Sequence, residues 1–122
     1  MSATSKTGSC PMDDILRTLM GPWTTYIVWV LRSEGPQRFS ALRRKVTGIS
    51  AKVLTERLRA LEAAGLVSRH YEPTIPPQVT YSLAKRGSEL SPALDALNEI
   101  ALRWAAADAS PGSEREGQRA AE

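Results

Sequence analysis

Cysteine and histidine are nearly absent from this chain, whose 122 residues include only Cys10 and His70 of these two types. A single cysteine excludes a disulfide within the chain, and it also excludes a cysteine-rich zinc site. A single histidine excludes a metal centre with two histidine ligands from one chain. We therefore expect no bound metal and no cofactor.

Long apolar segments are lacking too. No apolar run reaches the roughly 18 residues that a membrane-spanning helix needs, and the longest apolar-rich stretch, Tyr26 to Leu31, is far shorter. The segment from Met1 to Gly8 does not contain the hydrophobic centre of a secretion signal. We therefore expect a cytoplasmic protein that has no membrane partner.

The residue groups that carry most enzyme chemistry are also missing. The lone His70 lies next to Arg69 in a basic stretch, so it does not complete a Ser/His/Asp set. The sequence has no Gly-rich phosphate loop and no paired carboxylates on an apolar segment. We expect that the protein is not an enzyme.

Positive charge, by contrast, is concentrated in one part of the chain. The formal net charge is only +3, but the stretch from Arg38 to His70 has a large excess of basic over acidic side chains. Its acidic residues are Glu56 and Glu62, and its basic residues are Arg38, Arg43, Arg44, Lys45, Lys52, Arg57, Arg59 and Arg69. This excess favours a surface that binds a polyanion such as nucleic acid. A solvated face of arginine-rich helices would have the same composition.

The length corresponds to one domain, because domains usually have about 100–200 residues. Residues 1–9 are rich in Ser, Thr and Gly and predict a disordered N-terminal arm. Residues 10–104 are expected to form the folded domain. Residues 105–122, which are rich in Ala, Ser, Gly and charge, predict a flexible C-terminal tail.

Hydrophobic spacing within the domain predicts mostly helices with one β-hairpin, which is a mainly α member of the α+β class. Ser40 and Ser50 are expected N-caps, and Gly65 is expected to end a helix. Pro92 is expected to kink the last helix. The expected helices span residues 11–20, 23–32, 40–46, 51–64 and 85–107, and the two expected strands span 66–71 and 79–83.

Two short helices joined by a turn that contains Gly48 predict a helix-turn-helix, and the hairpin that follows makes it a winged helix-turn-helix. The second helix has an apolar stripe that includes Leu54, Leu58 and Leu61. Its opposite face is polar, as a helix that enters the major groove of DNA requires. The candidate base- or phosphate-contacting residues are Ser50, Ala51, Lys52, Thr55, Glu56 and Arg59.

Further residues around this helix are expected to contact phosphates or to belong to the wing. Such contacts set the affinity and the register on the duplex rather than the choice of sequence. These candidates are Arg38, Ser40, Arg43, Arg44, Lys45, Arg69 and Gln78. Arg57 lies toward the flank of the helix, where it is a candidate for orienting a neighbouring group.

Several short runs occur in a fixed order along the chain: Cys10-Pro11, Gly21-Pro22-Trp23, Arg38-Phe39-Ser40-Ala41-Leu42-Arg43, Gly48-Ile49-Ser50, Leu54-Thr55-Glu56-Arg57-Leu58, Leu61-Glu62-Ala63-Ala64-Gly65-Leu66-Val67, Pro76-Pro77-Gln78-Val79-Thr80-Tyr81-Ser82-Leu83 and Gly87. As an ordered set they resemble the HxlR family of winged helix-turn-helix transcriptional regulators. The resemblance covers about residues 10–104.

The resemblance implies a sequence-specific DNA-binding regulator that acts as a homodimer on a near-palindromic operator. In this family the first and last helices form the dimer interface, which implies that Ile15, Leu16, Leu19, Leu94, Leu97, Ile100 and Trp104 make a shared apolar surface here. The sequence departs from the family at two positions. Pro22 stands where members often have Lys, and Gln78 stands where they often have Arg or Lys, which weakens one expected wing–phosphate contact.

Cys10 immediately precedes an expected helix N-terminus, a position that favours a reactive thiol. Some members of the resembled family sense electrophiles or oxidants through a cysteine at this place. An oxidant or small-molecule effector is therefore one hypothesis, and an inert cysteine near the interface is the other. A ligand pocket lined by Trp23, Trp29 and Trp104 is a further hypothesis. A winged helix that binds only other proteins is the alternative to DNA binding.

Overall fold

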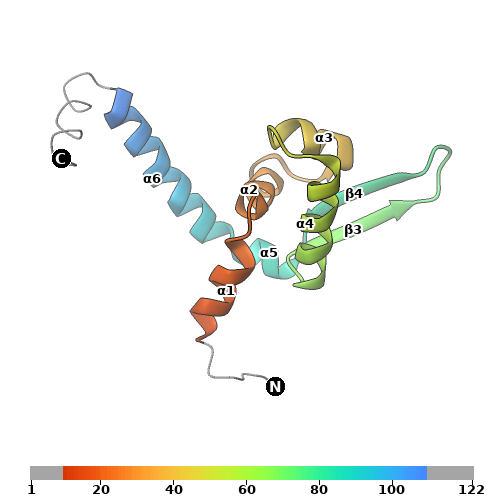
Figure 1. Ribbon diagram of the computed structural model, residues 1–122, viewed down its shortest axis with the longest axis horizontal. Coiled ribbons are helices and arrows are strands. Elements are labelled where there is room, and N and C mark those ends of the chain that lie inside the picture. The colour runs from red at the N-terminus through yellow and green to blue at the C-terminus, as the bar shows by residue number, and fades with distance from the viewer. Residues whose placement is uncertain (1–9, 110–122) are drawn as a thin grey trace. The chain divides into compact units, whose positions relative to one another are not determined.

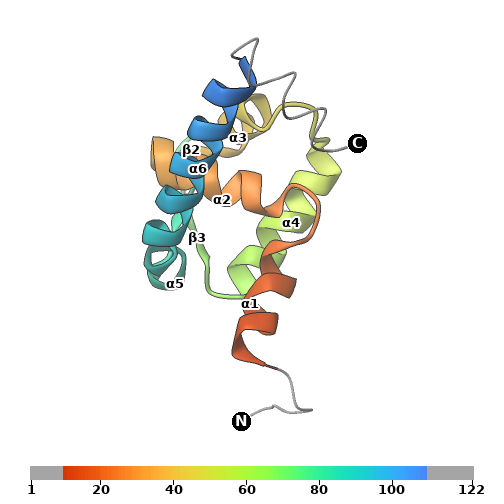
Figure 2. The same ribbon diagram turned by 90° about the vertical axis from the view of Figure 1, so that its left-hand side faces the viewer.

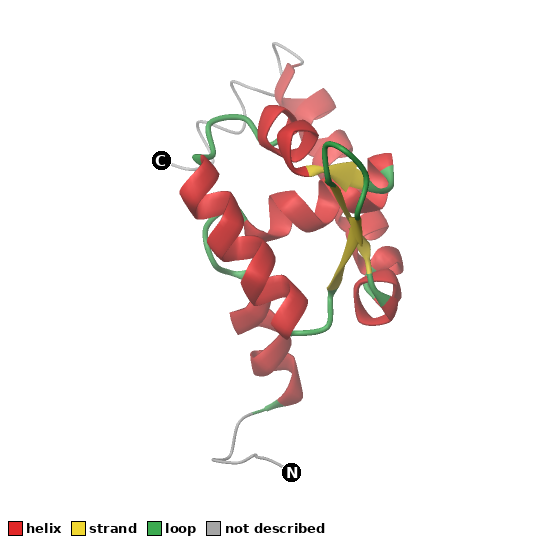
Figure 3. Ribbon diagram, turned by 90° about the vertical axis from the view of Figure 1, so that its right-hand side faces the viewer, coloured by secondary structure: helices red, strands yellow, loops and turns green. Residues whose placement is uncertain are grey.

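The computed structural model describes residues 10–109, which divide into two compact units at residue 90. Within the first unit the helices are α1 (Pro11–Leu19), α2 (Thr24–Glu34), α3 (Phe39–Lys45), α4 (Ala51–Ala63) and α5 (Lys85–Glu89), and the strands are β2 (Gln37–Arg38), β3 (Val67–Glu72) and β4 (Gln78–Leu83). The second unit contains α6 (Ser91–Ala109). The predicted fold class is confirmed, because the described chain is mostly helical and contains one small antiparallel sheet (Figure 3).

The core of the first unit is formed by side chains of α2, α3 and α4. Helix α2 is its central helix, as predicted, although Tyr26 and Trp29 are not fully covered. The hydroxyl of Tyr26 donates a hydrogen bond of 3.0 Å to the carbonyl oxygen of Lys45. The largest fully buried side chains are Ile27, Val28, Leu42, Val46, Leu54, Leu58 and Leu61.

The two predicted N-caps have different outcomes. Helix α4 begins as expected, because the Oγ of Ser50 accepts a hydrogen bond of 3.1 Å from the backbone N–H of Val53. The prediction for α3 is wrong: its N-cap is Arg38, whose side chain makes no capping hydrogen bond, and Ser40 lies inside the first turn. Gly65 follows α4 with a φ of +81°, a left-handed conformation that glycine adopts without steric cost.

The sheet has three strands in the order β2-β4-β3, rather than the two strands that were predicted. Strands β3 and β4 pair from Val67↔Leu83 to Glu72↔Gln78, and β2 adds the pairs Gln37↔Tyr81 and Arg38↔Thr80. A two-residue strand is too short to show an alternating pattern, so sequence reasoning could not detect it. Beyond this third strand, β3 and β4 project as a wing past α4 (Figure 1).

The last predicted helix is two helices, α5 and α6, rather than one kinked helix. Pro92 lies in the first turn of α6, where the missing N–H has no intrahelical partner to lose. Helix α6 continues to Ala109, so residues 105–109 of the predicted tail are helical. The predicted arm of residues 1–9 and the rest of the tail lie outside the described residues.

Candidate nucleic-acid interface

Helix α4 has one buried face and one exposed face, as the spacing of its leucines predicts. Leu54 and Leu58 are 0% and 2% exposed, and they hold the helix on the core together with Leu61. The predicted contact residues Lys52, Glu56 and Arg59 are all exposed on the outer face. The core therefore presents two cations and one carboxylate on a single helical face.

The smaller polar side chains of α4 have roles in the helix itself. The Oγ1 of half-buried Thr55 donates a hydrogen bond of 2.8 Å to the carbonyl oxygen of Ala51. The Oγ of Ser50 is an acceptor in the N-cap. The hydroxyl proton of Thr55 is therefore already engaged within the helix. Ala51 is half-buried at the start of the helix.

Helix α3 contributes two exposed cations and one that is paired. Arg43 and Arg44 are exposed, as is Ser40. The Nζ of Lys45 lies 2.7 Å from the Oε1 of Glu34 at the end of α2, forming a salt bridge. Lys45 is therefore a weaker phosphate candidate than its two neighbours, because an anion would have to compete with this carboxylate. The sequence did not indicate the pair, since its members belong to different helices.

The wing carries Arg69 and Gln78, the other two predicted contact residues. Arg69 and its neighbour His70 are exposed on β3, and Gln78 is half-buried at the start of β4. The Nη2 of Arg38 donates a hydrogen bond of 2.6 Å to the Oε1 of Gln78. This bond links β2 to the wing and places an arginine beside the uncharged Gln78.

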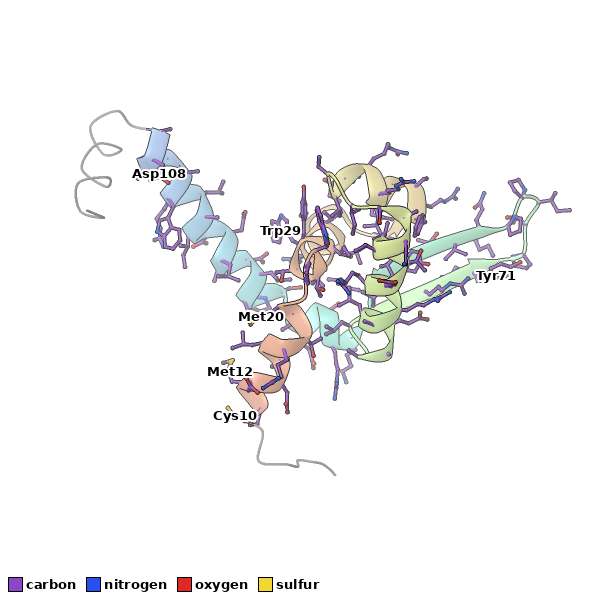
Figure 4. All side chains as sticks on the ribbon, viewed as in Figure 1. Cys10, Met12, Met20, Trp29, Tyr71 and Asp108 are labelled. Atoms are coloured by element: carbon purple, nitrogen blue, oxygen red, sulfur yellow. The ribbon has the colours of Figure 1, made fainter. Side chains whose placement is uncertain are left out.

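Two exposed apolar side chains of the wing were not among the predicted contacts. Tyr71 lies on the projecting part of β3 (Figure 4), and Ile75 at the tip is 100% exposed. In the sequence, the alternating side-chain pattern of β3 was the signal available for Tyr71. For Ile75 the signal was an apolar residue in a loop between prolines.

Helix α1 has no buried residue. Ile15 and Leu16, two of the predicted interface residues, are exposed, whereas Leu19 is half-buried. The Nε of Arg17 donates a hydrogen bond of 2.7 Å to the Oδ2 of Asp13, and this hydrogen bond raises the pKa of Arg17. The helix therefore presents a partly exposed apolar face next to a charged one.

Cys10 is the N-cap residue of α1 and lies at the N-terminal end of this helix (Figure 4). Its thiol is exposed and makes no capping hydrogen bond. The thiol is therefore accessible to a small oxidant.

Helix α6 carries the other predicted interface residues. Leu97 and Trp104 are exposed, Ile100 is half-buried and Leu94 is buried. Three of the four predicted side chains of this helix are thus at least partly open to a partner. Exposed Leu102 lies apart from them, because 100° per residue places it on another side of the helix.

Known proteins share both the sequence pattern and this arrangement. A family profile described as HxlR-like helix-turn-helix matches residues 18–109. The chain belongs to the HxlR family. A curated relative, the uncharacterised HTH-type transcriptional regulator YtfH of Escherichia coli strain K12, is 42% identical over 88 residues, which cover 72% of this chain and 69% of YtfH.

Two solved structures of regulators are similar to this chain along most of its length. The reduced form of the transcriptional regulator YodB from Bacillus subtilis has a TM-score of 0.64 at 32% identity, covering 84% of this chain and 97% of YodB. The redox regulator HypR in its oxidised form has a TM-score of 0.67 at 35% identity, covering 75% of this chain and 93% of HypR. Like its relatives in the HxlR family, the chain is a helix-turn-helix transcriptional regulator with a winged-helix fold.

The two departures from the HxlR pattern have structural counterparts. The carbonyl oxygen of Pro22 accepts a hydrogen bond of 2.9 Å from the Nε of Arg57, which is the flanking arginine of α4. Gln78 accepts its hydrogen bond from Arg38, so a positive charge lies beside the position where HxlR members often carry one.

Residues 10–109 contain no cluster of three or more His, Cys, Asp or Glu side chains that could hold a metal ion. None of the helices in this range combines the length and the apolar character needed to cross a membrane.

Proposed function

We propose that this chain is a cytoplasmic regulator that binds DNA sequence-specifically as a homodimer on a near-palindromic operator. The exposed polar face of α4 carries the proposal, because its leucines hold the helix on the core while Lys52 and Arg59 extend outward. An α-helix with its side chains is about 10–12 Å across. The major groove is about 12 Å wide and admits one such helix.

The side chains of this face suit base edges in the major groove. Lys52 and Arg59 are donors for the O6 and N7 acceptors of guanine, and Glu56 is an acceptor for the amino group of cytosine. The methyl group of Thr55 suits the methyl group of thymine. These three chemistries together support discrimination among base pairs rather than attraction to any duplex.

Phosphate contacts come from the exposed cations around α4. Arg43 and Arg44 on α3 and Arg69 on β3 are all exposed. Arg38 and Gln78 support a joint contact at the wing, in which the remaining N–H groups of both side chains are donors to one phosphate. Ser40 adds a hydroxyl at the start of α3.

The exposed apolar residues of α1 and α6 support dimerisation. Ile15 and Leu16 are exposed on α1, as are Leu97 and Trp104 on α6. A second copy of the chain would remove these surfaces from water. Two reading helices would then enter successive major grooves about 34–36 Å apart, which requires a near-palindromic operator.

Binding to proteins alone is the alternative function, and the composition of α4 disfavours it. The buried centre of a protein–protein interface is depleted in charged residues. The outer face of α4 instead presents Lys52, Glu56 and Arg59.

A salt titration tests the proposed function. If a dimer neutralises about 6–10 phosphates, its affinity for duplex DNA falls about 10³- to 10⁵-fold between 50 and 200 mM salt. The double variant Lys52→Glu/Arg59→Glu is expected to abolish recognition of an operator selected from a random duplex library. The matched control Lys85→Glu/Arg103→Glu makes the same change of net charge at exposed positions on α5 and α6. Operator affinity that is undiminished in the first variant would refute the proposal.

Cys10 is the proposed oxidant sensor of this regulator. Its exposed thiol at the start of α1 supports the role, and so does the similarity to the redox regulator HypR. Two Cys10 thiols from two protomers lose two electrons and two protons to hydrogen peroxide, giving one intersubunit disulfide and two water molecules.

Hydrogen peroxide is expected to change operator affinity in the parent and not in Cys10→Ser, with a disulfide-linked dimer on a non-reducing gel. A Cys10→Ser variant that responds like the parent would refute the sensing role.

A further inference from the structure

The turn between α1 and α2 is held against the helix-turn-helix by two side chains that the DNA interface does not use. The first is half-buried Arg57 of α4, whose Nε donates to the carbonyl oxygen of Pro22 at 2.9 Å. The Nε of an arginine carries a single N–H, so this bond fixes both the position and the direction of the guanidinium group. It connects the middle of α4 to a point 35 residues earlier in the chain.

The second side chain is Trp23, whose backbone has a φ of +72° and is left-handed. This conformation is disfavoured for a bulky residue and persists only where surrounding contacts impose it. Its ring lies against Gly48 in the turn between α3 and α4, because a Cβ built at Gly48 would be 3.4 Å from the Cη2 of Trp23. Gly48 itself has a φ of +94°, which glycine adopts readily.

Helix α1 is attached to the domain near the same turn. It has no buried residue along its length, and it points away from the body of the first unit (Figure 2). Its carboxyl end is held by the Oγ1 of Thr25, which donates to the carbonyl oxygen of Leu19 at 2.6 Å. No side chain of α1 is buried in the core, and its carboxyl end is attached to α2 next to the turn at residues 20–23.

We propose that this turn is a rigid link between α1 and the reading helix, with Arg57 and Trp23 as its positioning residues. A displacement of α1 is transmitted through Pro22 to Arg57, and through Trp23 to Gly48, so that it redirects α4. The effect of this link on DNA binding rests on the proposed function, because a second copy and an oxidant are expected to act at α1. The proposal also assigns Arg57 a role other than a phosphate contact.

A charge-preserving substitution separates these two roles of Arg57. Arg57→Lys retains the positive charge and most of the aliphatic stem, but it has no N–H at the position of Nε. Arg103→Lys is the matched control at an exposed position on α6, outside the proposed DNA contacts. For a positioning residue, Arg57→Lys lowers operator affinity about tenfold, as expected for the loss of one charged hydrogen bond. Its affinity for random duplex DNA and its salt dependence stay unchanged.

The opposite pattern would overturn the proposal. If Arg57 contacts a phosphate instead, Arg57→Lys binds the operator like the parent. Arg57→Gln then weakens binding to the operator and to random DNA alike, and it reduces the salt slope by about 2, one contact for each protomer of the homodimer.

A second measurement needs no DNA. Spin labels are placed at Thr18→Cys on α1 and Ala60→Cys on α4 in a Cys10→Ser background, and labelled chains are diluted with unlabelled ones. The distance distribution is expected to be narrow in the parent and in Arg103→Lys, and broader in Arg57→Lys and in Trp23→Phe.

Equal distance distributions in the parent and the three variants would refute the rigid link, even if the parent binds the operator. A parent that binds no duplex would refute the proposed function, and the distances would still decide the link.

Discussion

Helices α1 and α4 have similar amphipathic sequences but opposite burial. Leu54 and Leu58 of α4 are 0% and 2% exposed, whereas Ile15 and Leu16 of α1 are 47% and 44% exposed. In both helices the apolar side chains recur at the spacing of one helical face. The difference shows that an amphipathic pattern determines which face is apolar, and that the rest of the chain determines whether this face is covered.

The two helices also begin differently. Ser50 accepts a capping hydrogen bond at the start of α4, whereas Cys10 makes no side-chain capping bond at the start of α1. Helix α4 is therefore stabilised at its end and along its face by its own chain. For α1 the proposed second copy of the chain would cover the apolar face.

The largest expected effect is the difference in unfolding free energy lost when a leucine is truncated on the apolar face of α4 and on that of α1. Leu58→Ala is expected to lower the free energy of unfolding by about 2–5 kcal/mol, because it leaves a cavity in the core. Leu16→Ala is expected to cost less than about 1 kcal/mol at concentrations where the chain is monomeric, since its side chain is already half in water. Urea denaturation monitored by circular dichroism measures both values. Equal losses would show that α1 packs on the domain as α4 does.

The next prediction addresses the partner of α1. Leu16→Glu is expected to raise the dimer dissociation constant at least about tenfold, because it places a charge in an apolar interface. Thr18→Glu on another side of the same helix is the control, with little change expected. Sedimentation velocity over a concentration series measures the constant. An unchanged dimer in Leu16→Glu would exclude this face of α1 from the interface.

A smaller effect compares the two N-caps. Ser50→Ala is expected to cost about 1 kcal/mol of unfolding free energy, the usual value of a lost N-cap hydrogen bond. Cys10→Ala is expected to change it by less than about 0.5 kcal/mol, because no such bond is lost. Thermal denaturation resolves the two variants. A Cys10→Ala loss equal to that of Ser50→Ala would contradict the different roles of the two residues.

The smallest expected effect distinguishes two neighbouring cations of α3. Arg44→Ala is expected to reduce the salt slope of DNA binding by about 2, because the homodimer loses one phosphate contact from each protomer. Lys45→Ala is expected to reduce it by less, because Lys45 is already paired with Glu34 at 2.7 Å. Binding isotherms at four salt concentrations provide both slopes, and a larger decrease for Lys45→Ala would reverse this assignment.

Much of the interface-bearing part of the fold could be predicted from local patterns. The apolar stripe of α4, its Ser50 cap and its Gly65 end are confirmed, because each depends on residues a few positions apart. Strand β2 and the true start of α3 were missed, since Gln37 and Arg38 become a strand only by pairing with β4.

By itself the sequence determined the family, the helical faces and the exposed Lys52–Arg59 surface, because short-range spacing and capping chemistry encode these features. The tertiary structure alone decided that several charged side chains are already engaged, among them Lys45 with Glu34, Arg38 with Gln78 and Arg57 with Pro22. These partners lie 11, 40 and 35 residues apart in the chain. Only the folding of the helices and strands against one another brings such distant groups within hydrogen-bonding distance.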